Sequence, residues 1–156
     1  MLKVIGLGNI LRGDDGIGPV IIRALEKRKI PDPVQLCDAG SDAFIILDHL
    51  LGTDPVLIID CARLGEKPGT IQKIITKDID LIPKEVGMSL HGYSLTEVWQ
   101  LARSMGAEND LTIIGIEPEK IQFNSGLSEV VKKGIPTIIK MVEEEAKKYA
   151  KKDSHH

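Results

Sequence analysis

Apolar positions along the chain alternate between short continuous runs and stretches with helical spacing. Short runs that are almost entirely apolar are typical of parallel strands buried on both faces. They occur at residues 2–7, 34–37, 56–59 and 111–116. Apolar residues that recur every three or four positions predict helices at residues 17–25, 41–51, 94–102 and about 127–150. This alternation predicts an α/β fold, a three-layer α/β/α sandwich with a mostly parallel central sheet.

Polar residues at the predicted helix ends add detail. Ser41 is suited to begin the second helix, and the Ser94-Leu-Thr-Glu97 segment fits a capping box that begins the third, with Leu101 on its apolar face. Pro136 predicts a kink in the last helix. The alternating segment at residues 70–76 predicts an edge strand, and residues 79–88 an irregular loop.

Length and composition narrow the possible functions. The 156 residues suit one domain, which we expect to span residues 1–150, with residues 151–156 as a disordered tail. A net charge of −3 and an aromatic content of 3% argue against a nucleic-acid partner. No apolar stretch is long enough for a membrane span or an export signal. We therefore expect a soluble cytoplasmic protein with no membrane partner.

A glycine-rich loop follows the first predicted strand and permits two interpretations. Its sequence, GLGNILRGDDGIG at residues 6–18, begins like a dinucleotide-binding fingerprint. That fingerprint places its third glycine where this chain has Leu11, and Asp14 and Asp15 would repel a pyrophosphate at the helix start. Asp38, after the second strand, could still imitate the acid that binds a ribose. Helix capping explains one aspartate but not two adjacent ones between glycines.

Two further residues follow elements of the predicted sheet. Asp60 ends the most apolar strand, and His91 lies just ahead of a helix start. Either could have an ordinary role, since aspartates stabilise turns and most loop histidines are surface groups. Because ligands of parallel α/β sheets bind at the carboxyl edge, Asp15, Asp60 and His91 could instead form a mixed oxygen and nitrogen site for a borderline divalent ion.

The two cysteines and the absent motifs limit the chemistry further. Cys37 and Cys61 are too few for a disulfide scaffold, and we interpret them as buried small side chains, leaving them out of the site. The sequence has no Gly-x-Ser-x-Gly elbow, no His-Glu-x-x-His helix and no phosphate-binding loop ending in Lys-Ser or Lys-Thr. The familiar hydrolase motifs are therefore missing.

Taken together, the residues resemble the hydrogenase maturation endopeptidases, which process the large subunits of NiFe hydrogenases. The likeness covers nearly the whole chain and is most specific in the first loop. It is carried by residues 6–18, 38–41, 57–60, 68–70, 89–91, 115–118 and 126–128. The second of these segments reads Asp38-Ala39-Gly40-Ser41 where the family commonly has Asp-Gly-Gly-Thr, so its turn must accept a Cβ at Ala39.

The resemblance implies an activity and a set of roles. Asp15, Asp60 and His91 would bind nickel that the large-subunit precursor carries, and the enzyme would remove the C-terminal extension of that precursor. Asp15 is one methylene shorter than the glutamate of many relatives. The nickel could polarise the scissile carbonyl or lower the pKa of a bound water. Asp38 is the remaining candidate for a catalytic role, that of orienting this water.

Two other classes of function remain open at this point. A non-enzymatic nickel chaperone for hydrogenase assembly could use the same three ligands. A nucleotide-binding α/β domain would share only the first loop.

Overall fold

The computed structural model describes residues 1–30, 34–76 and 93–153. The elements in chain order are β1 (Leu2–Leu7), the short 3-10 helix η1 (Gly13–Gly16), α1 (Ile17–Glu26), β2 (Val34–Gly40), α2 (Ala43–Leu50), β3 (Val56–Cys61), β4 (Ile71–Thr76), α3 (Leu95–Ser104), β5 (Leu111–Ile116) and α4 (Glu129–Asp153). The five strands form one sheet in the order β2-β1-β3-β5-β4, in which only β4 is antiparallel to its neighbour. The predicted three-layer α/β/α fold is confirmed.

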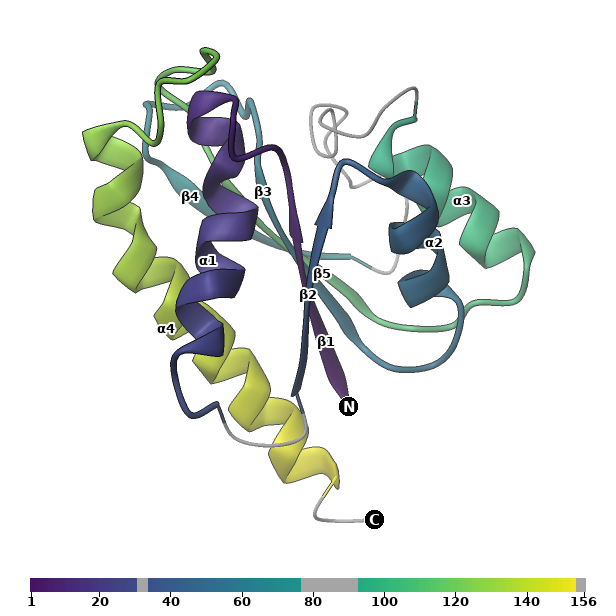
Figure 1. Ribbon diagram of the computed structural model, residues 1–156. Coiled ribbons are helices and arrows are strands. Elements are labelled where there is room, and N and C mark those ends of the chain that lie inside the picture. The colour runs from purple at the N-terminus through teal and green to yellow at the C-terminus, as the bar shows by residue number, and fades with distance from the viewer. Residues whose placement is uncertain (31–33, 77–92, 154–156) are drawn as a thin grey trace.

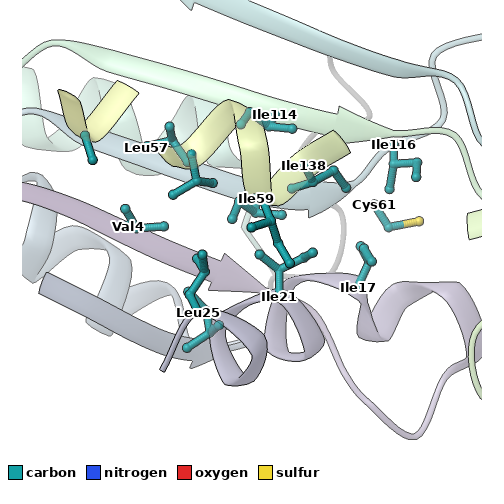
Figure 2. Packing of buried hydrophobic residues seen from close by; sticks show 14 of the residues in the cluster. Val4, Ile17, Ile21, Leu25, Leu57, Ile59, Cys61, Ile114, Ile116 and Ile138 are labelled. Carbon is teal, nitrogen blue, oxygen red and sulfur yellow. The ribbon is translucent and has the colours of Figure 1, made fainter. Parts of the chain in front are cut away.

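The helices cover the sheet in pairs, α1 and α4 on one face and α2 and α3 on the other (Figure 1). Alternate residues of β3 point to the two faces, so Leu57 and Ile59 pack under α1 and α4 (Figure 2), while Val56 and Ile58 pack under α2 and α3. Every residue of β3 is buried. This explains the unbroken apolar run at residues 56–59, since a central strand with two covered faces has no solvent side.

Several predicted element boundaries shift in the structure. Asp42, not Ser41, is the N-cap of α2, and its carboxylate accepts the backbone N–H groups of Phe44 and Ile45. The predicted capping box at Ser94 and Glu97 is present. The last helix begins at Glu129 and reaches Asp153, so residues 151–153 are helical although the sequence suggested a tail from residue 151. Residues 154–156 and the predicted loop at 79–88 lie outside the described ranges.

The strand order creates a topological switch point between β1 and β3. The chain leaves β1, passes through α1 and pairs β2 on one side of β1; it then returns through α2 and pairs β3 on the other side. Connections that diverge in this way leave a crevice at the carboxyl edge, where ligands of open α/β sheets bind. Among the described residues, no helix combines the length and apolar character needed to cross a bilayer.

Candidate functional site

Asp15 lies at the carboxyl edge of β1, where η1 folds back over the strand. One carboxylate oxygen accepts the backbone N–H of Asn9 at 3.0 Å, and the residue is only 5% exposed. The close approach depends on Gly8, which has a φ of +121°; a Cβ there would lie 1.8 Å from the Asp15 carbonyl oxygen. Burial raises the pKa of Asp15, against the opposing effects of the Asn9 hydrogen bond and the Arg12 charge.

The neighbouring Asp14 is wholly buried and has a different role. Its carboxylate accepts four hydrogen bonds, from the backbone N–H groups of Glu119, Lys120 and Ser128 and from the Ser128 hydroxyl, at 2.7–2.9 Å. Asp14 therefore ties η1 to the segment between β5 and α4. Neither aspartate caps α1, whose N-cap is Gly16 without a side-chain hydrogen bond. The capping interpretation of this pair is wrong.

Asp60 is the fifth residue of β3 and is fully buried. Its neighbours Ile59 and Cys61 pack on the α1 and α4 face, so strand alternation directs its side chain to the α2 and α3 face. On the adjacent β5 the residue opposite Asp60 is Gly115. A Cβ at Gly115 would lie 3.4 Å from the Ala62 Cβ and 3.6 Å from the Leu64 Cδ1, so these two side chains pack over the glycine.

Asp15 and Asp60 lie on either side of the switch point between β1 and β3. Burial raises the pKa of the Cys61 thiol, and the negative charges of Asp60, Asp15 and Asp14 raise it further. The 3-10 helix η1, which carries Asp15, packs against β3, which carries Asp60. The structure thus places these two predicted residues on contacting elements at the carboxyl edge, although 44 residues lie between them in the chain.

Asp38 is exposed and lies on the other side of β1. One carboxylate oxygen accepts the Gly40 backbone N–H at 3.0 Å, which closes the turn after β2. Both flanking residues, Cys37 and Ala39, pack on the α2 and α3 face, so alternation directs Asp38 to the face opposite Asp60. The turn accepts the Cβ of Ala39 because this methyl group packs in the core, and the residue is 3% exposed.

Next to the switch point is a pocket of about 600 Å³. Its lining includes Gly8 and Asn9 from the first loop, Asp38 and Gly40 from β2, and Tyr93 just ahead of α3. Asp15 does not itself line the pocket, but it accepts the backbone N–H of Asn9, which does. The pocket therefore adjoins the loop that carries the first predicted ligand.

Glu117 supports the site in a way that the sequence alone did not reveal. It is 7% exposed, and its two carboxylate oxygens accept the backbone N–H groups of Leu64 and Glu66, at 2.8 and 3.0 Å. These bonds fix the loop that directly follows Asp60. The only signal in the sequence was an acidic residue directly after an apolar strand, the same pattern that singled out Asp60.

His91, the third predicted ligand, lies outside the described residues. Within the described ranges no three histidine, cysteine, aspartate or glutamate residues are grouped as a metal site. Cys37 and Cys61 are free thiols, and Cys61 packs in the core under α1 and α4, as the sequence suggested. What the structure describes is a pair of acids at the switch point.

Comparison with known proteins is consistent with this geometry. A family model for hydrogenase maturation proteases (HycI) matches residues 19–145. The chain is 33% identical over 137 residues to the hydrogenase expression/formation protein HoxM of Azotobacter vinelandii, covering 84% of this chain and 65% of that protein. It is 32% identical over 145 residues to the hydrogenase 2 maturation protease of Escherichia coli, covering 90% of this chain and 87% of that protein.

A solved structure gives the same result. The hydrogenase maturating endopeptidase HybD from E. coli superimposes with a TM-score of 0.76 at 29% identity, covering 90% of this chain and 88% of that one. The superposition covers 90% of this chain and the family model matches residues 19–145, so the likeness is not limited to the loop that resembles a nucleotide fingerprint. The chain belongs to the hydrogenase maturation protease family.

Proposed function

We propose that this protease removes the C-terminal extension of the NiFe hydrogenase large-subunit precursor after nickel has been inserted. In this proposal Asp15, Asp60 and His91 bind the nickel that the precursor carries, so that one ion serves both recognition and cleavage. The observation that carries the proposal is that Asp15 and Asp60, both almost completely buried, lie on contacting elements, η1 and β3, at the switch point. Residues 1–150 would act as one peptidase domain, and the two free thiols suit a reducing cytoplasm.

The chemistry of the two acids suits an ion that arrives with its own ligands. Carboxylate oxygens and an imidazole nitrogen are ligands that borderline divalent metals accept, and three protein ligands leave coordination positions open. A bound divalent ion can polarise the scissile carbonyl or lower the pKa of a water molecule.

The position of Tyr93 supports His91 as the third ligand. Tyr93 lines the same pocket as Asn9 and Asp38, and two residues of chain span at most about 7 Å. Tyr93 is the first described residue after His91 in the chain. His91→Ala should abolish processing without changing the melting temperature of the enzyme.

Processing should depend on nickel in the precursor. Incubated with nickel-loaded precursor, the enzyme should release a C-terminal peptide detectable by mass spectrometry; metal-free precursor should stay intact. The control is free nickel added to the enzyme alone before metal-free precursor is supplied, which should not restore cleavage. Equal cleavage of both precursors would contradict the proposal, and nickel transfer without a released peptide would favour a chaperone.

Asp38 is the candidate for orienting the attacking water, and a single variant tests this role. Asp38→Asn removes the charge but keeps an oxygen that can accept the Gly40 N–H, so the turn after β2 should persist. A general base or water-orienting acid contributes about 10²- to 10⁴-fold to the rate, so kcat should fall by at least about a hundredfold. Normal kcat in this variant would exclude Asp38 from the reaction.

A further inference from the structure

The outer face of α2 is more apolar than a solvent-facing helix requires. Only Ile46 and Leu50 of this helix are buried in the core. Phe44 is 71% exposed and Ile45 38% exposed, and both lie in the first turn of α2. A helix that is apolar around most of its circumference is expected to be covered, and contiguous exposed apolar side chains mark interaction sites.

A hollow of about 210 Å³ lies between this face and α3. Phe44 and Leu47 of α2 line one side, and Val98 and Leu101 of α3 line the other. Glu97 is the one charged residue among those that line it, and its carboxylate already accepts the Ser94 backbone N–H in the capping box. The hollow therefore offers an apolar surface of a size that suits one or two side chains.

The hollow is continuous with the pocket beside the switch point. Ala43, Phe44 and Tyr93 line both the 600 Å³ pocket and the smaller hollow. Asn9 lines the large pocket and donates its backbone N–H to Asp15, so a peptide with its scissile bond at Asp15 and Asp60 would reach the hollow between α2 and α3 by way of this pocket. A segment joined covalently to the cleavage point reaches this surface without a separate docking event.

We propose that the hollow between α2 and α3 binds an apolar part of the precursor's C-terminal extension, on the leaving-peptide side of the scissile bond. This inference rests on the proposed function and adds to it a determinant of substrate affinity. The extension would insert one or two large apolar side chains between Phe44, Leu47 and Leu101, where 49% of Leu101 is exposed in the free enzyme. Burial of Leu101 by the extension would strengthen binding without touching the reacting atoms.

The test compares two variants that place the same charge on exposed apolar positions. Leu101→Glu should raise KM for nickel-loaded precursor by about tenfold, because a carboxylate would have to be desolvated in the hollow, while kcat changes little. Ile75→Glu, at a position on the edge strand β4 that is 66% exposed, should leave both constants unchanged. Melting temperatures of both variants should match that of the native enzyme, and Leu101→Ala, which introduces no charge, should raise KM less.

Precursors with altered extensions identify the occupant. Replacing the apolar residues of the extension with serine should raise KM for the native enzyme, and Leu101→Glu should add little to that increase, since both changes remove one interaction. Fully additive effects would assign the hollow to the body of the large subunit and overturn the inference. It would also fail if Leu101→Glu left KM unchanged, or if this change converted a dimeric enzyme to monomers.

Failure of the proposed function would look different. In that case the native enzyme itself would release no peptide from nickel-loaded precursor, whatever residue occupied position 101. Processing by the native enzyme together with an unaltered KM for Leu101→Glu would reject only the role of the hollow.

Discussion

Asp14→Asn is expected to lower the free energy of unfolding by about 3 kcal/mol. The native carboxylate accepts four hydrogen bonds and is fully buried. An asparagine keeps only one acceptor oxygen, and its NH₂ group would face backbone N–H donors. Buried donors left without acceptors cost about 1–3 kcal/mol each, partly offset by the smaller desolvation of a neutral side chain. Urea denaturation at neutral pH measures the loss.

Asp42→Asn provides the matched control for this prediction. Asp42 is exposed and also accepts backbone N–H groups, but as the N-cap of α2, a position where asparagine serves as well as aspartate. The free energy of unfolding of Asp42→Asn should stay within about 0.5 kcal/mol of the native value. Equal stability of the Asp14 and Asp42 variants would contradict the structural role assigned to Asp14.

Asp15→Asn is expected to reduce processing of nickel-loaded precursor at least about a hundredfold without loss of stability. The substitution weakens a proposed nickel ligand, whereas its amide oxygen can still accept the Asn9 N–H. Asp60→Asn should reduce processing by a similar factor. Single-turnover cleavage measured beside thermal unfolding separates the two effects, and an Asp15→Asn enzyme with normal processing would remove Asp15 from the site.

The difference in stability between the native protein and Asp15→Asn should depend on pH in a defined direction. Burial raises the pKa of Asp15 above its ordinary value of 3.8, so the folded state holds this proton more tightly than the unfolded chain. Native stability is therefore lost as the pH rises from 3.8 through the raised pKa. Asp15→Asn has no such loss, so the difference in melting temperature should favour the variant at neutral pH and vanish well below pH 3.8. The opposite trend would show that the ionised carboxylate stabilises the fold.

The sheet was predictable from the sequence because its strands are buried on both faces. The runs at 56–59 and 111–116 have no alternating polar residues that would mark a solvent-facing side, and both segments are interior strands of the sheet. Asp60 could be placed at the carboxyl edge because it directly follows the first of these runs. The faces of Asp38 and Asp60 also follow from alternation, since Cys37 and Ala39 are the apolar neighbours of the first and Ile59 and Cys61 those of the second.

Other parts of the site were not accessible to this reasoning. Asp14 and Asp15 are adjacent identical residues, and only the hydrogen-bond partners of Asp14, more than 100 positions away, distinguish the structural acid from the proposed ligand. The support from Glu117 likewise comes from a distant loop. Leu101 was assigned to the buried face of its helix and is 49% exposed. Periodicity indicates which face of a helix is apolar, but not whether a neighbouring element covers all of that face.

The bonds between Asp14 and Ser128 have a consequence for biosynthesis. The first loop contains one proposed ligand, yet its shape is secured by amides and a hydroxyl that the ribosome adds 105 to 114 residues later. A nascent chain that ends before residue 119 lacks every donor to this carboxylate. The shape of the loop that carries the proposed ligand Asp15 should therefore be fixed only near the end of translation.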